Sequence, residues 1–507
     1  MRPQPSPFDA DALRLVGDVP TTRAEFVRRA SGSALGLALL GGVGFDGLRL
    51  LGAEDADAAT LRSPNDVRRF HSRPDLRPPR LTILRAGKSD HCLFLSPSSG
   101  AGQRGALILD EKGEVVWFRP TRPDTVMNFR TALYKGEPVL TWWQGRAARG
   151  LGVGFHVIVD STYREVARLP AGAGRQSDLH EFTLTPRGTA IVTSYEIRTA
   201  NLSRVGGPSS GKVIGSIVQE IAIPSARVLF EWRSLDHVSV DEAYNMYNGH
   251  AFDYFHINSV DVDADGNLLV SARNTWAVYK VDSETGRVLW RLGGKRSDFQ
   301  MGPGTRFAWQ HDARHHDEGR LISIFDNSAA PPVASQSRVL VIELDRRQRR
   351  ARLVRQYTHP RRLLSPFMGN AQVLPNGNVV VGWGGLPYIT EFRRGGGVHF
   401  DARLPAGGQN YRAFRLPWQG RPHRPPRLVA HTASGRRRLY VSWNGATEVA
   451  AWRLEAGPAR NDLQTVLTRP KQSFETSLPV PRRDGFATVV ALGPRGQILG
   501  RSNTIRL

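Results

Sequence analysis

The sequence predicts an all-β protein: a six-bladed β-propeller over residues 75–404, followed by a small C-terminal β-sandwich over 427–507. Three observations predict this fold. The 51 glycines and 33 prolines are scattered along the chain, which is typical of many tight turns. One strand–turn–strand theme recurs from about Leu81 to Phe400, and the theme changes after about Leu404. With 507 residues, the chain is long enough for two or three structural units.

Residues 1–60 have the pattern of an export signal followed by a linker. The basic stretch Thr21–Arg29 precedes the weakly apolar stretch Ala30–Gly44, an order typical of secretory signals. It is similar to a twin-arginine signal in which Ala24 replaces one of the paired arginines. We therefore expect an exported, extracytoplasmic protein, secreted or associated with the cell envelope. The alternative is an amphipathic helix at the start of a cytoplasmic protein. The apolar stretch is too short and too glycine-rich for a stable membrane span, and no later stretch qualifies.

The propeller prediction depends on four aligned copies of one hairpin. Each copy runs from its first residue to a turn glycine: His180 to Gly188, His256 to Gly266, His311 to Gly319 and Asn370 to Gly377. Apolar and polar residues alternate around Asp-Gly and Asn-Gly turns, which is typical of β-hairpins. A spacing of roughly 50 residues or more, with four strands per unit, fits propeller blades. Two earlier segments, 81–117 and 128–168, raise the count to six blades.

Beyond the repeats, residues 405–426 are expected to form a linker, because the run Arg421–Pro426 contains three prolines. Short alternating segments then recur at regular intervals, with Trp443 on an early strand. This pattern is typical of a fibronectin-III- or immunoglobulin-like sandwich. A further, degenerate blade is the alternative.

The chain is strongly basic, with 69 Lys and Arg against 46 Asp and Glu and a formal net charge of +23. The excess is spread along the chain, and the short runs 346–350 and 436–438 carry no interleaved aromatic residues. We therefore expect no nucleic-acid partner; a positive field that attracts small anions is an open alternative to solvated loops. Cys92 is the only cysteine, which excludes an intramolecular disulfide and a multi-cysteine zinc site.

Three motifs that suggest a cofactor or metal are incomplete. The glycine-rich run Gly206–Lys212 is followed by Val213, where a phosphate-binding loop needs Ser or Thr. Asp261–Gly266 opens like a calcium loop, but its twelfth position is Ala272 instead of a bidentate Glu. A zinc site at His311, His315 and His316 would need a ligand from elsewhere in the chain. We therefore expect neither a metal nor a cofactor.

One set of residues survives as a candidate site. His180, His256 and His311 occupy the same place in the repeat, and the innermost strands of propeller blades surround one axis. The three imidazoles are therefore expected to converge on one channel. Seven residues after successive turn glycines stand Tyr195, Arg273, Asp326 and Gly384, so that Arg273 is expected beside a histidine ring.

The motifs around these residues resemble the arylsulfotransferase family, particularly its actinobacterial branch. The resemblance covers roughly residues 80–400. Its motifs are Phe255–Val260 with Ser271–Asn274, Trp290–Gly294, Trp309–Asp312 and Phe325–Asn327. The extra domain here follows the propeller, whereas it precedes the propeller in the characterised enterobacterial enzymes, and their cysteine pair has no counterpart.

The resemblance implies a six-bladed propeller that carries sulfate from one phenol to another through a sulfated histidine, without a nucleotide donor or cofactor. His311 would be the nucleophile, with His180, His256 and Arg273 as its partners; which histidine acts as acid stays open. Small-molecule aryl sulfates and phenols are the expected partners, and a homodimer is an open alternative to a monomer. Expected substrate contacts are Tyr195, Asn258, Trp276, Asp326, Asn327 and Asn370.

Two other functions remain as alternatives. One is a non-catalytic exported propeller that binds anionic ligands or a surface partner. The other is a metal-dependent hydrolase, which a chelator would inactivate.

Overall fold

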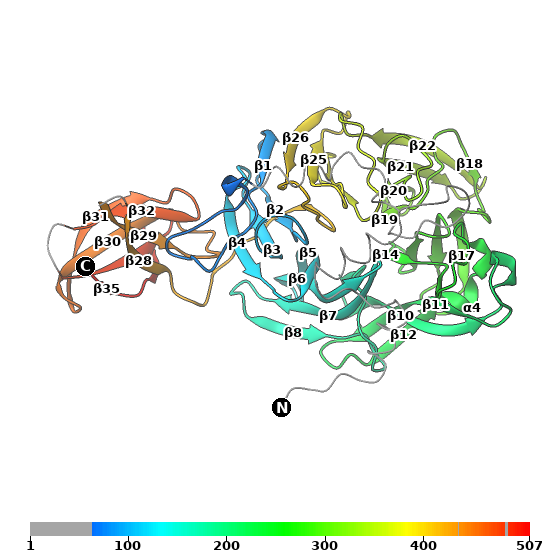
Figure 1. Cartoon of the computed structure of the whole chain (residues 1–507), viewed down its shortest axis with the longest axis horizontal. Coiled ribbons are helices and arrows are strands. Elements are labelled where there is room, and N and C mark those ends of the chain that lie inside the picture. The colour runs from blue at the N-terminus through cyan, green and yellow to red at the C-terminus, as the bar shows by residue number, and fades with distance from the viewer. Residues whose placement is uncertain (1–62, 434–435, 482–484) are drawn as a thin grey trace, which may run out of the picture. The chain divides into compact units, whose positions relative to one another are not determined.

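The computed structural model describes residues 63–433, 436–481 and 485–507 (Figure 1). The expected export segment, residues 1–60, lies outside the described residues. Half of the structure is strand and only 3% is helix, which confirms the all-β class. None of the helices in the described part of the chain is long and apolar enough to cross a membrane.

The chain divides into two compact units. Among the described residues, the first unit contains 145–155 and 169–367, and the second contains 63–144, 156–168 and 368–507. The boundary runs through one four-stranded sheet, whose strand order is β5–β6–β7–β8. Its strands are β5 (Thr125–Tyr134), β6 (Glu137–Ala148), β7 (Leu151–Val159) and β8 (Glu165–Leu169).

The first unit contains three sheets, each built from four strands that are consecutive in sequence and antiparallel. The first is β9 (Phe182–Leu184), β10 (Thr189–Ala200), β11 (Gly211–Ala222) and β12 (Val228–Arg233). The second is β14 (Ile257–Val262), β15 (Leu268–Ala272), β16 (Ala277–Val281) and β17 (Val288–Gly293). The third is β19 (His311–His316), β20 (Leu321–Asp326), β21 (Arg338–Asp345) and β22 (Arg350–Tyr357). Figure 1 shows these sheets following one another, with β14 next to β19.

Short elements connect and extend these sheets. Strand β13 (Phe252–Asp253) pairs in parallel with β11, and β18 (Gln300–Met301) pairs in parallel with β22. The helical turns of this unit are η3 (Ser203–Val205), α4 (Ser234–His237) and η4 (Val240–Glu242).

The hairpins form where the sequence places them, because the turn glycines adopt a left-handed conformation that other residues avoid. Gly188, Gly266 and Gly319 have φ of 75°, 80° and 75°. Apolar residues on the faces of neighbouring sheets then pack together. One core cluster joins the β9–β12 and β14–β17 sheets, and a second joins the β14–β17 and β19–β22 sheets.

The three histidines stand at equivalent places in these sheets, as the repeat predicts. His180 precedes β9 by two residues, His256 precedes β14 by one, and His311 opens β19. Each of these strands is the first of its four-stranded meander and lies at one edge of it. In each of the three sheets, a histidine therefore lies at or just before the start of the first strand.

The second unit contains two further four-stranded antiparallel meanders. One is ordered β27–β2–β3–β4, with β2 (Cys92–Leu95), β3 (Gly105–Leu109), β4 (Val115–Pro120) and β27 (Phe414–Leu416). The other is β23 (Asn370–Val373), β24 (Val379–Gly382), β25 (Tyr388–Phe392) and β26 (Val398–Arg403). Strand β1 (Thr82–Arg85) extends the second of these sheets by pairing with β26.

Strand β27 lies within residues 405–426, the segment expected to form a linker. This strand pairs with β2, where Phe414 lies opposite Phe94. Three residues are too few to show a period-2 pattern, and their partner lies more than 300 residues away in sequence. No local signal therefore identifies this strand.

A three-stranded and a five-stranded sheet follow after residue 426. One is β28 (Arg427–Ala433), β29 (Arg436–Ser442) and β32 (Glu475–Pro479). The other is β30 (Ala451–Ala459), β31 (Asp462–Pro470), β33 (Phe486–Leu492), β34 (Ile498–Arg501) and β35 (Ile505–Arg506). Leu439 and Leu478 of the first sheet and Leu454 and Val489 of the second belong to one buried cluster, so the two sheets share a core.

Candidate active site

The structure brings the three histidines and Arg273 together in the first unit. The rings of His180 and His256 are edge to face, with centroids 5.1 Å apart. His311 lies within electrostatic reach of Arg273, His180 and His256. All four side chains are buried, with exposed fractions of 3–8%. Residues separated by up to 131 positions in sequence therefore form one group. The three histidines lie at or just before the first strand of a sheet, and Arg273 lies in the turn after β15.

The backbone around this group is held in an unusual conformation. His256, Trp276, Trp309 and Asp312 all have positive φ, between 50° and 54°. Bulky side chains avoid this region unless the surrounding structure compensates for its cost, and such residues gather at functional sites. The register of β19 also shifts between His311 and Arg314. This local geometry marks the group as more than regular sheet packing.

His311 has a defined tautomer. Its Nδ1 lies 2.7 Å from Oδ1 of Asn327. Nδ2 of Asn327 donates to the backbone carbonyl of Ser365 at 3.0 Å, and this carbonyl can only accept. The amide oxygen must therefore face His311, whose Nδ1 carries the proton and donates it. Nε2 of the neutral ring then holds a lone pair.

The surroundings keep this ring neutral. Burial disfavours the charged form, and the positive charges of Arg273, His180 and His256 act in the same direction. The hydrogen bond to Asn327 opposes them, but the pKa of His311 lies well below its usual value. A neutral imidazole with its lone pair on Nε2 is a competent nucleophile near neutral pH.

His180 is paired with a carboxylate instead of an amide. Its Nδ1 lies 2.5 Å from Oδ2 of Asp178, which also accepts the backbone N–H of His180 at 3.0 Å. Burial would raise the pKa of the Asp178 carboxyl, but the charge of His180 and the hydrogen bonds from His180 and Gly152 outweigh it, so that the pKa lies below its ordinary value. Asp178 is therefore ionised at neutral pH.

His256 has a carboxylate partner of its own. Its Nδ1 lies 2.5 Å from Oδ2 of Asp253, at the end of β13. The backbone carbonyl of His256 accepts from Arg273 N–H at 3.0 Å, which joins the entrance of β14 to the turn after β15. The parallel pairing of β13 with β11 fixes the backbone that carries Asp253.

Arg273 is a buried cation whose charge no ion pair neutralises among the described residues. Its Nη1 donates to Oδ1 of Asn274 at 2.9 Å, and its Nε has no hydrogen-bond partner in the described structure. Burial lowers the pKa of the guanidinium to about 10, although Asp253 acts in the opposite direction, so Arg273 stays protonated at neutral pH. A buried guanidinium with an unused donor favours an anionic ligand.

Aromatic rings flank this cation. The guanidinium carbon of Arg273 lies 4.7 Å from the ring centroid of Trp309. Trp309 meets Trp276 edge to face at 5.0 Å, and Trp276 stacks on Tyr244 at 3.7 Å. Trp276 is partly buried and Tyr244 is exposed, so this aromatic cluster connects the buried charge to solvent-exposed surface.

The family described as arylsulfotransferase (ASST) matches residues 130–404, which is more than half of the chain and includes all four residues. The chain belongs to the arylsulfotransferase family. No curated protein matches the sequence.

Two solved structures are similar to parts of this arylsulfotransferase-family chain. A protein of unknown function from Bacteroides caccae has 14% identity and a TM-score of 0.41, over 64% of this chain and 98% of that one. A catalytically inactive virginiamycin B lyase from Staphylococcus aureus, in complex with quinupristin, has 7% identity and a TM-score of 0.35, over 72% and 97%. At such low scores neither similarity supports a conclusion about the candidate site.

The substrate contacts expected for an arylsulfotransferase have different surroundings. Tyr195 Oη donates to the carbonyl of Ile257 at 3.2 Å and lies 3.5 Å from Nδ1 of His180. Asn258 Nδ2 donates to the carbonyl of Gln310 at 2.6 Å and so links β14 to the segment before β19. These two residues and Trp276 lie at the site, and their role as substrate contacts stays a prediction.

The other three expected contacts form hydrogen bonds with other groups of the protein. Asn327 contacts Nδ1 of His311, on the side of the ring away from Nε2. Asp326 accepts from Ala308 N–H at 3.0 Å, Ser328 Oγ at 2.8 Å and Arg338 Nε at 3.0 Å. Asn370 belongs to the second unit, where it exchanges two hydrogen bonds with the backbone of Ala413. No substrate role is tested for any of them.

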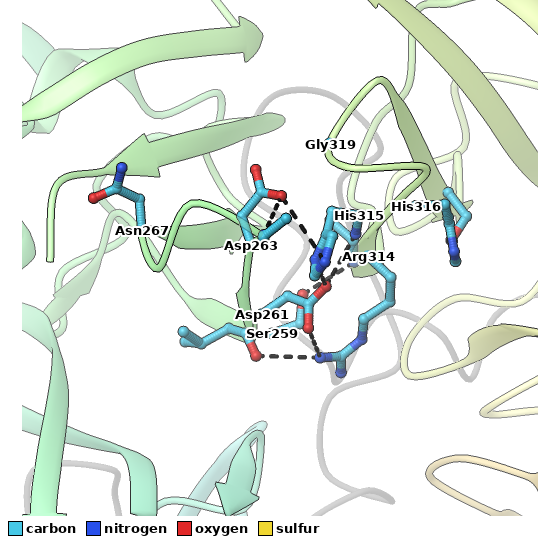
Figure 2. Close-up of polar contacts among 12 residues, drawn as sticks. Ser259, Asp261, Asp263, Asn267, Arg314, His315, His316 and Gly319 are labelled. Carbon is cyan, nitrogen blue, oxygen red and sulfur yellow. Dashed lines mark hydrogen bonds and ion pairs between the residues drawn. The ribbon is translucent and has the colours of Figure 1, made fainter. Parts of the chain in front are cut away.

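A second polar group lies at the other end of β14 and β19, and Figure 2 shows Arg314 and His315 facing Asp261. Nδ1 of His315 lies 2.6 Å from Oδ2 of Asp261, and its Nε2 lies 3.9 Å from Asp263. The hydrogen-bond partner of the His315 ring is therefore Asp261. Across the described residues, no three His, Cys, Asp or Glu side chains are close enough to hold a metal ion.

Arg314 connects all three sheets of the first unit. It pairs with Glu181 at 2.5 Å and Asp312 at 2.7 Å, and donates to the carbonyl of Val260 at 3.1 Å. Burial would lower the pKa of Arg314, but Asp312, Glu181 and Asp261 outweigh it and raise the pKa above its usual value. This arginine is therefore a fixed charge that supports the sheets next to the candidate site.

Sequence reasoning missed two residues of the site, Asp178 and Asp253. They precede His180 by two positions and His256 by three, and this short spacing is the one signal that could have found them. Acidic residues are common in loops, so such a spacing has little specificity without the fold. Trp309 was part of a recognised motif, but its contact with Arg273 depends on the turn geometry.

Proposed function

We propose that this protein is an aryl sulfotransferase that moves a sulfuryl group from an aryl sulfate to a phenol through a sulfohistidine on His311, without a nucleotide sulfate donor. The tautomer of His311 is the observation that carries this proposal: Asn327 and Ser365 hold Nδ1 as the donor, which leaves the lone pair on Nε2. The family match and the buried guanidinium of Arg273 support it further.

In the first half of the reaction, Nε2 of His311 attacks the sulfur of the aryl sulfate. The bond between sulfur and the aryl oxygen breaks, its electron pair stays on that oxygen, and His180 or His256 supplies the proton that forms the phenol. Arg273 contacts the sulfuryl oxygens while the bonds rearrange, because its planar fork binds two oxygens at once.

In the second half, the acceptor phenol enters and returns a proton to the same histidine. Its oxygen attacks the sulfur, and the electron pair of the N–S bond returns to Nε2 of His311. No proton is gained or lost over the cycle, and no nucleotide is consumed. The aromatic cluster of Tyr244, Trp276 and Trp309 offers rings on which the aryl groups of donor and acceptor stack.

We also propose that residues 75–404 form a six-bladed propeller, and that residues 427–507 form a fibronectin-III- or immunoglobulin-like sandwich. The six four-stranded meanders support the first proposal, and the shared core of the two last sheets supports the second. Export from the cytoplasm and a homodimer remain proposals, which fractionation of the native host and light scattering would test.

The test of the proposed activity uses 4-nitrophenyl sulfate as donor and phenol as acceptor. We expect release of nitrophenolate and formation of phenyl sulfate, and an acid-labile sulfate on His311 when the donor is added alone. His311→Ala should abolish both. The matched control is His316→Ala, on the same strand, because His316 bonds Ser323 outside the site and the variant should keep full activity.

The alternative, a non-catalytic propeller that binds anionic ligands, predicts a different result. Binding of the aryl sulfate without turnover, unchanged in His311→Ala, would favour it. Full transfer activity in His311→Ala would show that the sulfohistidine mechanism is wrong.

A further inference from the structure

The three histidines of the site differ in what their Nδ1 atoms contact. His180 and His256 each face a carboxylate oxygen at 2.5 Å, whereas His311 faces an amide oxygen at 2.7 Å. A carboxylate oxygen accepts hydrogen bonds, so Nδ1 of His180 and of His256 is the donor in each pair. Each carboxylate therefore orients its ring, so that Nε2 lies on the side of the ring away from the carboxylate.

We infer that Asp178 and Asp253 are positioning residues that give the two rings different tasks. Asp253 makes His256 the histidine that exchanges a proton with the phenol oxygen, and Asp178 holds His180 as a fixed donor to the sulfuryl oxygens. This inference rests on the proposed sulfotransferase function and deepens it.

Asp178 has its hydrogen-bonding capacity filled. Besides the ring of His180, it accepts the backbone N–H of Gly152 at 2.8 Å, the N–H of His180 at 3.0 Å and the hydroxyl of Thr193 at 3.2 Å. Its side chain is 0% exposed. Its negative charge is shared among four donors. Such a carboxylate fixes the direction of His180 and changes little when charge develops on the substrate.

Asp253 accepts fewer hydrogen bonds than Asp178. Its Oδ2 contacts His256, but its Oδ1 is buried and has no hydrogen-bond partner in the described structure. Its charge is therefore less satisfied than that of Asp178, and it interacts more strongly with a proton on its histidine. The side chain of Asp253 is 23% exposed, so this pair also lies nearer to solvent than the other. Both properties suit a ring that gives up and regains a proton in each cycle.

Gly150, in the turn between β6 and β7, keeps one edge of His256 open. A Cβ atom at this position would lie 2.9 Å from Cε1 of His256 and 3.4 Å from its Nε2. The φ of 81° at Gly150 also disfavours any other residue. The edge of the ring that carries Nε2 is thus free of a side chain on this side, as access by a substrate oxygen requires.

The experiment compares two donors whose leaving groups differ in basicity. Phenolate is a poor leaving group that needs a proton, whereas 4-nitrophenolate leaves with little help. With Asp253→Asn, we expect kcat/KM to fall on the order of 10²-fold for phenyl sulfate and less than about tenfold for 4-nitrophenyl sulfate. With Asp178→Asn, we expect equal falls for both donors, because a fixed donor to the sulfuryl group serves both alike.

Asp261→Asn is the matched control, since it breaks another histidine–carboxylate pair, with His315, on the same strand pair. It should lower the unfolding temperature without changing the ratio of the two donors. An equal loss for both donors in Asp253→Asn, or an unequal loss in Asp178→Asn, would overturn the division of tasks. Rescue of phenyl sulfate turnover by Asp253→Glu would support it.

A measurement without turnover separates this inference from the proposed activity. The Nδ1 proton of His256, in a 2.5 Å bond to a carboxylate, should give a low-field proton resonance that is lost in Asp253→Asn and kept in Asp178→Asn. Persistence of that resonance in Asp253→Asn refutes the pairing whether or not any donor is turned over. Absence of turnover with both donors in the wild type refutes the sulfotransferase proposal alone.

Discussion

Replacing Asn327 with Asp tests the chemical state of His311 most directly. In Asn327→Asp the atom 2.7 Å from Nδ1 of His311 changes from an amide oxygen to a carboxylate oxygen, with almost no change in shape. A carboxylate so close favours the charged imidazolium and should raise the pKa of His311 by about 1 to 3. Each unit corresponds to about 1.36 kcal/mol between the two protonation states.

The sign of the effect on activity follows from the role of the ring. The wild-type pKa of His311 lies well below its usual value, so the nucleophile stays neutral as the pH falls through about 6.5, and activity is lost only at lower pH. In Asn327→Asp, protonation begins at higher pH. The ratio of wild-type to variant kcat/KM should therefore rise about tenfold for each pH unit below the new pKa, and approach a constant at alkaline pH.

The assay follows release of 4-nitrophenolate from 4-nitrophenyl sulfate between pH 5 and pH 9, with phenol as acceptor. Asn327→Ala is the control, because it removes the acceptor without adding charge and should slow the reaction without moving the acid limb upward. If Asn327→Asp and the wild type share the same acid limb, His311 is not the group that must be neutral, and the reasoning from its tautomer fails.

Two further predictions concern the cations of this unit. Arg273→Lys should reduce kcat for sulfuryl transfer by about 10²- to 10³-fold while the protein stays folded, since a lysine loses both the planar fork and the contact with Trp309; steady-state kinetics with circular dichroism as a folding check would measure this. Arg314→Met should destabilise the protein by about 3–5 kcal/mol, because Glu181 and Asp312 then stay buried without their cation. Urea unfolding measures that loss, and adding Glu181→Gln to Arg314→Met should recover part of it; no recovery would contradict the ion-pair explanation.

The sequence allowed the repeat and the register of the histidines to be predicted, because both depend on local patterns. Turn glycines such as Gly266 can be identified in the sequence, and the alternation of apolar and polar residues on either side of them predicts the two strands of each hairpin. The histidines could be aligned because each stands a similar distance before its turn. Their meeting followed from one physical step: equivalent positions in neighbouring sheets lie close together, as the 5.1 Å separation of His180 and His256 shows.

The partners of those histidines could not be predicted with the same means. Asn327 reaches His311 from the end of the next strand, but its orientation depends on the carbonyl of Ser365, 38 residues further on. Asp253 depends on the parallel pairing of the two-residue strand β13 with β11. Strand β27 was missed for the same reason, since its register is set by β2 and by nothing in its own three residues.

The repeat places the three histidines, whereas the residues that differ between its copies give each histidine different surroundings. Repetition places chemically identical imidazoles at equivalent points, and identical rings in identical surroundings could not divide a reaction between them. The division arises where the repeat is broken: a carboxylate with four donors beside His180, a carboxylate with a spare oxygen beside His256, and an amide beside His311. A nucleophile needs the amide, because a carboxylate at that position would favour the protonated ring and remove the lone pair. The residues that distinguish the three positions, more than the histidines themselves, determine which chemistry a chain with this arrangement performs.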